Sequence, residues 1–166
     1  MITTRLQSSW TSGSRCDDSS TAAPGDGSES TRITPIPAAG GYWGLLRHNG
    51  GGATQNLSAF ANGSLNVWIK TNGYPGKLEI GIASDTENRT GAEAYVQLSP
   101  GSFGYCNTNQ WCTVSIPVSA FLAANPKLDL RYVNFRFIIA DRFDKTGNFQ
   151  RTGLPKIWID GITWSR

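Results

Sequence analysis

The chain has 166 residues, a length that fits one domain with an apolar core of its own. Charged residues make up 16% and the formal net charge is +3, with no basic run, which argues against a nucleic-acid partner. No stretch approaches the roughly 20 consecutive apolar residues of a membrane-spanning helix. Helical periodicity is nearly absent and Gly, Ser, Thr and Asn are abundant, so the composition indicates an all-β extracellular protein.

The N-terminal part of the chain shows neither strand nor helix periodicity. Residues 7–31 are rich in Ser, Gly, Thr and Asp, which predicts a linker or loosely ordered segment over residues 1–27 and a folded domain over residues 28–166. Residues 1–15 lack the apolar centre of a signal peptide. We expect a secreted protein whose signal has been removed, or one piece of a longer secreted protein.

From Ser28 onward, apolar and polar residues alternate in segments separated by Gly, Pro, Asn and Asp. A single helical turn is predicted in PVSAFLAAN, where Pro117 and Ser119 favour a start and Asn125-Pro126 a stop. About eight strands with a turn every dozen residues predict a β-sandwich jelly roll of two antiparallel sheets. The predicted strands are 31–36, 41–48, 64–71, 77–83, 93–99, 111–117, 131–140 and 155–164.

Alternation also predicts which side chains face the core, because successive residues of a strand point to opposite faces. In SLNVWIK, Leu65 and its alternate neighbours point inward, whereas Trp68 points outward. The same parity predicts a core of Leu65, Val67, Ile69, Leu78, Ile80, Ile82, Ala94, Val96, Leu98, Val114, Ile116, Val133, Phe135, Phe137, Ile139, Ile157 and Ile159.

The three cysteines are an odd number. Cys106 and Cys112 bracket the short loop CNTNQWC, and a disulfide across it would staple a turn between two strands. Two buried thiols are the alternative. Cys16 stays open: unpaired, bonded outside the domain, or a competitor for either of the other two.

The sequence offers little for catalysis. His48 is the only histidine and lies in a glycine-rich RHNGGG turn, which excludes a His-based metal site and a Ser-His-Asp arrangement. The carboxylates show no acid/base spacing, and the glycine runs lack the lysine of a phosphate-binding loop. We therefore expect a protein that is not an enzyme.

One predicted sheet has an outward face that suits a sugar. The strands 41–48, 131–140, 77–83 and 93–99 are expected to form this sheet. A sugar ring needs an aromatic platform for its C–H face and planar polar groups for its hydroxyls. We expect stacking on Trp43 and Tyr95, and hydroxyl recognition by Arg47, Glu79, Gln97, Asn134 and Arg136.

Loops and the other sheet add weaker candidates. Arg89 and Tyr105 are the loop residues expected to contact a ligand, and further loop candidates are Asp85, Asn88, Phe103, Asn107, Arg142, Phe143, Gln150 and Arg151. The other sheet would present Asn66, Trp68, Lys70, Thr113, Ser115 and Trp158, under a possible cover by the N-terminal segment. Ordinary polar surface is the alternative for any one of these positions.

Three phrases carry a family resemblance. NLSAFANGSLNVWIKT, QWCTVSIPVSAF and KIWIDGITW, in this order over residues 56–164, resemble strands of galactose-binding-like jelly-roll carbohydrate-binding modules appended to microbial glycoside hydrolases. The resemblance implies a non-catalytic polysaccharide-binding domain with the chain on a concave sheet. We expect a β-glucan ligand and a covalently attached catalytic domain, without nucleic-acid or membrane partners.

The resemblance also implies a structural Ca²⁺ near the closing strand. Asp160 occupies the position of an aspartate that commonly helps to hold this ion, with Asp26 or Glu29 as acidic partners. The alternative is that Asp160 only caps a bulge before Gly161 and binds no ion. Three other functions stay open: a small polysaccharide lyase, a binder of acidic polysaccharides, and a structural or adhesive sandwich.

Overall fold

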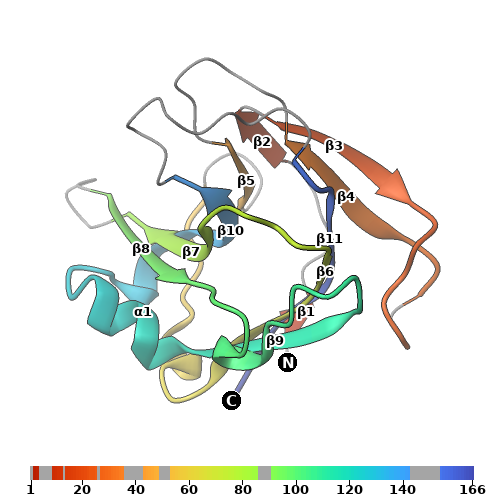
Figure 1. Cartoon of the computed structure of the whole chain (residues 1–166). Helices are drawn as coiled ribbons and strands as arrows, with labels where there is room; N and C mark the ends of the chain where they lie inside the picture. Colours follow the sequence, from red (N-terminus) through yellow and green to blue (C-terminus); the bar gives the residue numbers. More distant parts are fainter. Residues whose placement is uncertain are drawn as a thin grey trace.

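The computed structural model describes residues 2–3, 9–12, 14–25, 27–35, 43–48, 53–85, 91–142 and 154–166. Two antiparallel β-sheets face each other across one apolar core, so the predicted all-β sandwich class is confirmed (Figure 1). All eight predicted strands are present, with ends shifted by at most a few residues. The predicted division of these strands between the sheets is also correct.

The six-stranded sheet has the order β3-β4-β11-β6-β9, and β1 pairs with β11 beside this path. Its strands are β1 (Ile2–Thr3), β3 (Ser14–Ser19), β4 (Ser30–Pro35), β6 (Ser64–Thr71), β9 (Cys112–Pro117) and β11 (Ile157–Ser165). The five-stranded sheet has the order β2-β5-β10-β7-β8. Its strands are β2 (Ser9–Ser12), β5 (Trp43–His48), β7 (Leu78–Ser84), β8 (Ala92–Gln97) and β10 (Val133–Asp141).

The N-terminal part differs from the expected linker over residues 1–27. The strand β3 pairs with β4 along its whole length, from Ser14 opposite Pro35 to Ser19 opposite Ser30, and β2 pairs with β5. An edge strand buries few side chains, so β3 forms from the polar sequence SRCDDS, in which Ser14 is buried and Cys16 is half-buried. Backbone hydrogen bonds to β4 stabilise this strand. Its sequence therefore needs no alternation of apolar and polar residues that would predict a strand.

Short helical elements connect the strands. The helix α1 (Val118–Ala124) follows Pro117, ends at Asn125 and buries Val118 and Phe121, which confirms the predicted turn. The 3-10 turns are η2 (Ser58–Phe60), η3 (Ser102–Gly104) and η4 (Leu130–Tyr132). Over the described parts of the chain, the helices are too short and too polar to cross a membrane.

The core between the sheets contains the predicted residues with one exception. The exception is Phe135, which packs instead with Ile138 on the outer face of the five-stranded sheet. The pairing of β10 with β7 shifts register twice, between Val133 and Phe135 and between Phe135 and Ile138. The first bulge turns Phe135 outward and the second restores the predicted alternation. Val133, Phe137 and Ile139 remain in the core.

Another bulge lies in β11 and brings two further residues inward. The register with β6 shifts between Asp160 and Thr163, and Gly161 has φ of 55°. After this shift, Ile162 and Trp164 join the core beside Ile159, and the Trp164 side chain is fully buried. Burial of each large apolar side chain contributes about 1.5–3 kcal/mol, so this core is a main source of the stability of the domain.

The predicted disulfide between Cys106 and Cys112 is present, with Cα atoms 6.1 Å apart. It closes the loop between η3 and β9. Asn107 within this loop accepts a hydrogen bond from the Tyr74 backbone N–H through Oδ1 and donates to the Tyr74 carbonyl through Nδ2, at 2.7 and 3.1 Å. Cys16 lies in β3 opposite Ile33 and does not compete for this bond.

Candidate functional site

The outer face of the five-stranded sheet combines a small apolar patch with a polar cluster. The register places Tyr95 opposite Gly81 and Glu79 opposite both Gln97 and Ala140. Ala83, Ile138 and Ala140 form a second apolar cluster against which Tyr95 and Phe135 pack. Tyr95 and Glu79, both expected on this face, therefore lie on it.

Tyr95 rests on a residue that has no side chain. A Cβ atom at Gly81 would lie 2.6 Å from Tyr95 Cδ1 and 2.7 Å from Cε1, so the ring passes directly over this glycine. Such an aromatic ring across a cross-strand glycine covers the bare backbone and fixes the ring. The tyrosine hydroxyl donates a hydrogen bond to Glu93 Oε2 at 3.0 Å, which orients it further.

Arg142, the residue after β10, joins Glu79 to Tyr95. Its Nε and Nη2 atoms donate to the two carboxylate oxygens of Glu79 at 2.7 and 3.1 Å, a bidentate ion pair. Its Cζ atom lies 3.4 Å from the Tyr95 ring centroid. The guanidinium is therefore stacked on the ring, and we call Glu79, Glu93, Tyr95 and Arg142 the Arg142 cluster.

The cluster is electrostatically coupled. Burial tends to lower the pKa of Arg142, but hydrogen bonds and the charge of Glu79 outweigh it and raise this pKa. Burial, followed by the neighbouring Glu93 carboxylate, raises the pKa of Tyr95 well above its ordinary value of 10.0. One cation and two carboxylates give the cluster a formal charge of −1, with the Glu79 side chain only 4% exposed.

The cluster pairs Glu79 with Arg142, a contact that the sequence does not predict. Glu79 was expected to recognise sugar hydroxyls, but both of its oxygens accept hydrogen bonds from Arg142 and it is buried. Arg142 appeared among the loop candidates but not among the expected binding residues. Its partner could not be read from the sequence because the ion pair joins residues 63 positions apart.

Other expected residues lie at the start of β10 and on the edge strand. Gln97 is exposed in β8. Arg136 Nη1 donates to Gln55 Oε1 at 3.2 Å, its buried Nε atom has no hydrogen-bond partner, and burial lowers its pKa. The side-chain oxygen Oδ1 of Asn134 accepts a hydrogen bond from the Phe135 backbone N–H, so this side chain stabilises the backbone at the bulge.

Four expected residues are not placed on this face by the described side chains. Tyr105 is 3% exposed and packs in the core, where burial raises the pKa of its hydroxyl. Trp43 and Arg47 stand in β5 opposite Asp141 and Phe137, but their side chains lie outside the described part of the chain. Arg89 lies outside the described residues altogether.

Of the expected calcium ligands, Asp160 and Glu29 lie among the described residues. The two carboxylate oxygens of Asp160 accept backbone N–H groups, from Gly161 at 2.9 Å and from Ala23 at 3.0 Å. Glu29 is exposed, and Asp26 lies outside the described residues. No group of three His, Cys, Asp or Glu side chains suited to a metal occurs in the part that the structure describes. Asp160 in this structure holds the bulge and the segment before β4.

Two antiparallel sheets with a Tyr95 ring and a stacked Arg142 guanidinium on one outer face are typical of β-sandwich carbohydrate-binding modules. The family model of carbohydrate binding domain 30 matches residues 3–166, so the chain belongs to this family. Members of this class bind carbohydrate without catalysing its conversion, which confirms the expectation that the protein is not an enzyme. The resemblance stated from the three sequence phrases is also confirmed.

Solved structures show the same fold at low identity. The family 30 module of a cellulosomal cellulase of Clostridium thermocellum is 18% identical, with a TM-score of 0.75 over 97% of this chain and 94% of that chain. Another family 30 module is 19% identical, with a TM-score of 0.74 over 99% and 98%. The family 11 module of C. thermocellum, in complex with a β-1,3-1,4-mixed-linked tetrasaccharide, is 16% identical, with a TM-score of 0.61 over 93% and 85%. No curated protein sequence matches the chain.

Proposed function

We propose that this module binds a β-glucan chain on the outer face of the five-stranded sheet. The observation that carries the proposal is the Arg142 cluster, in which a partly exposed planar group is held rigidly on the Tyr95 ring. Pyranose rings of a glucan present C–H faces that pack on planar groups and hydroxyls that accept N–H donors. The complex of a family 11 module with a mixed-linked glucan supports the same ligand class.

Arg142 rather than Tyr95 is the proposed platform. The Tyr95 ring has Gly81 beneath it and the guanidinium stacked on it, whereas the Arg142 side chain is 40% exposed. Arginine has five N–H donors, and the two bonds to Glu79 leave three donors for sugar hydroxyls. Tyr95 and Glu79 then act as positioning residues, and the exposed Gln97 extends the polar rim.

The charge of this face favours a neutral chain. The cation of Arg142 is compensated by Glu79, and Glu93 adds a further negative charge next to Tyr95. A polyuronate placed here would meet like charges, whereas an uncharged glucan loses nothing by this arrangement. This contrast separates the β-glucan proposal from the acidic-polysaccharide alternative at the same face.

Isothermal titration calorimetry against mixed-linkage, β-1,3-linked and β-1,4-linked gluco-oligosaccharides tests the proposal. We expect saturable binding that Arg142→Ala weakens about tenfold, the effect of losing one stacked, hydrogen-bonded group. Thr113→Ala, an exposed change on the opposite sheet, is the matched control and should bind as the parent does. Absence of binding to every glucan, or equal affinity of parent and Arg142→Ala, contradicts the proposal.

We further propose that the protein is secreted and that the module keeps an attached glycoside hydrolase near its substrate. Tethering raises the effective concentration of the catalytic domain on a polysaccharide without new chemistry. The cellulosomal cellulase that carries one structural relative supports this role. Fusion of the module to a glucanase should increase hydrolysis of insoluble glucan but leave hydrolysis of short soluble oligosaccharides unchanged.

Calcium stays a prediction for this chain. An ion near Asp160 would have to draw on Asp26 and on backbone carbonyls, because Ala23 and Gly161 already donate to the Asp160 carboxylate. A calcium-loaded protein should unfold at a higher temperature than the same protein after chelation. Equal unfolding temperatures in the two conditions, with no heat of calcium binding, would contradict the prediction of a structural calcium ion.

A further inference from the structure

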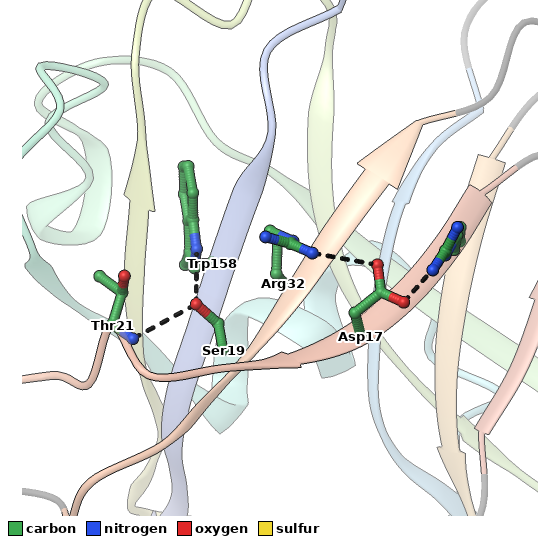
Figure 2. A network of polar contacts seen from close by, with 6 residues as sticks. Asp17, Ser19, Thr21, Arg32 and Trp158 are labelled. Carbon is green, nitrogen blue, oxygen red and sulfur yellow. Dashed lines mark hydrogen bonds and ion pairs between the residues drawn. The ribbon is translucent and has the colours of Figure 1, made fainter.

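The outer face of the six-stranded sheet carries a second aromatic group in a different electrostatic setting. Trp158 lies in β11, directly opposite Arg32 in β4 and Lys70 in β6. Arg32, Lys70 and Trp158 are each only partly buried. Figure 2 shows the indole standing on β11 with Arg32 and Asp17 on the neighbouring strands. The strand β3 extends the sheet beside β4 rather than covering Trp158.

The indole is held in place by its polar edge. Trp158 Nε1 donates a hydrogen bond to Ser19 Oγ at 3.3 Å, and the same oxygen accepts from the Thr21 backbone N–H at 3.3 Å (Figure 2). Lys70 Nζ lies 5.7 Å from the ring centroid, within the range of a cation–π interaction. A fixed aromatic ring loses little conformational entropy when a ligand packs on it.

The charged residues around Trp158 are mostly basic. Asp17 accepts from Arg15 Nε at 2.9 Å and from Arg32 Nη2 at 3.4 Å, and this pairing lowers the Asp17 pKa. Three cations, from Arg15, Arg32 and Lys70, and two carboxylates, from Asp17 and Asp160, give a formal charge of +1. Together with Trp158 we call these residues the Trp158 patch.

A second tryptophan widens the aromatic surface. Trp68 in β6 lies opposite Asp160 in β11 and Thr113 in β9, which makes it the diagonal neighbour of Trp158 on the same face. Diagonal neighbours in a sheet lie about 7–8 Å apart at their backbones, within reach of large side chains. The carboxylate of Asp160 is already engaged by two backbone N–H groups.

We propose that the Trp158 patch is a second glycan-binding surface, and that its ligand is an acidic polysaccharide built from uronate residues. The C–H face of a pyranose packs on the indole, and the ring carboxylate lies between the cations of Arg32 and Lys70. The Arg142 cluster on the opposite sheet has a formal charge of −1 and the Trp158 patch +1, so the two clusters favour ligands of different charge. This surface is independent of the proposed β-glucan site.

The test is calorimetric titration of the full chain with oligogalacturonate, in parallel with a neutral gluco-oligosaccharide of equal length. We expect saturable oligogalacturonate binding that Trp158→Ala and the double change Arg32→Gln with Lys70→Gln each weaken about tenfold. Added salt should weaken this binding but leave glucan binding unchanged, since only the uronate carries charge. Trp158→Phe keeps an aromatic ring without the Ser19 bond and should retain part of the affinity.

Two controls make the outcome decisive. Arg142→Ala alters the opposite face, and Arg131→Gln removes another exposed cation, which pairs with Asp129; both should bind oligogalacturonate as the parent does. Binding that falls equally in Arg131→Gln reveals nonspecific attraction and overturns the proposal. No binding, or undiminished binding in the Arg32 and Lys70 double variant, overturns it as well. The glucan titration reports separately on the other face.

Discussion

The most instructive single residue is Gly81, because the position of Tyr95 depends on the side chain that Gly81 lacks. The Tyr95 ring lies over the glycine, and the Arg142 guanidinium stacks on the ring. We expect Gly81→Ala to displace the ring and to weaken glucan binding about tenfold, since the new methyl would meet Tyr95 at 2.6 Å. Calorimetric titration measures this. Gly91→Ala, where a Cβ would lie at an ordinary contact distance of 3.7 Å from the Ser84 carbonyl oxygen, controls for the change of glycine to alanine. Unaltered affinity in Gly81→Ala would show that the ring position is unimportant.

The buried Tyr105 makes a prediction about alkaline stability. Burial raises the pKa of its hydroxyl above the ordinary value of 10.0, so the folded state favours the neutral phenol. This contribution is complete below pH 10.0 and is lost as the pH rises toward the folded-state pKa. Between pH 10.0 and the folded-state pKa, the free energy of unfolding of the parent should fall relative to that of Tyr105→Phe by up to about 1.4 kcal/mol per pH unit. Chemical denaturation at several alkaline pH values checks it; parallel curves would contradict the assignment.

At the residue scale, the sequence predicts positions better than partnerships. Strand parity placed Tyr95 and Glu79 on the outer face because alternation depends only on local backbone geometry. It could not predict that Arg142 engages both, because this contact depends on rotamers and on strands that are distant in the chain. Tyr105 was misjudged for a related reason: an aromatic residue in a Gly- and Ser-rich loop gives no periodicity from which burial can be inferred.

The strands show where a period-two pattern fails. Parity is correct along β6, β7 and β9, which carry no bulged residue themselves, but it is wrong for Phe135 in β10. A bulge adds one residue to one strand, and its position depends on the partner strand as well as on the local sequence. The bulge in β11 is marked in the local sequence by Asp160-Gly161, because Gly161 adopts a positive φ and its N–H donates a hydrogen bond to Asp160.

The loop closed by the disulfide predicts a modest gain in stability. A bridge between residues 6 positions apart constrains a short loop, for which chain entropy suggests about 2 kcal/mol. We expect the double change Cys106→Ser with Cys112→Ser to lower the unfolding temperature by about 5 °C, measured by differential scanning calorimetry. Reductant should lower the parent similarly and leave the double variant unchanged. If reductant lowered the unfolding temperature of both proteins equally, the lost stability would not come from the disulfide between Cys106 and Cys112.

At the scale of the molecule, the first residues of the chain are structural. The strand β3 covers the edge of β4, and Ala23 is buried and donates to Asp160. Deletion of residues 1–27 should therefore destabilise the remainder by several kcal/mol, since each lost backbone hydrogen bond costs about 0.5–1.5 kcal/mol. Chemical denaturation of the two chains measures the difference. A linker in this region predicts identical unfolding curves, so the experiment separates the two interpretations directly.

The pairing of β1 with β11 has a consequence for protein engineering. Ile2 stands opposite Trp164, so the two termini lie side by side at one end of the sandwich (Figure 1). A short peptide can bridge such neighbouring ends, which allows new termini to be opened in an exposed turn such as the one around Pro100 and Gly101. For the same reason, the module can be inserted into a surface loop of a host protein without stretching either junction. Circular permutants would then present both sheet faces in new orientations relative to whatever is fused to them.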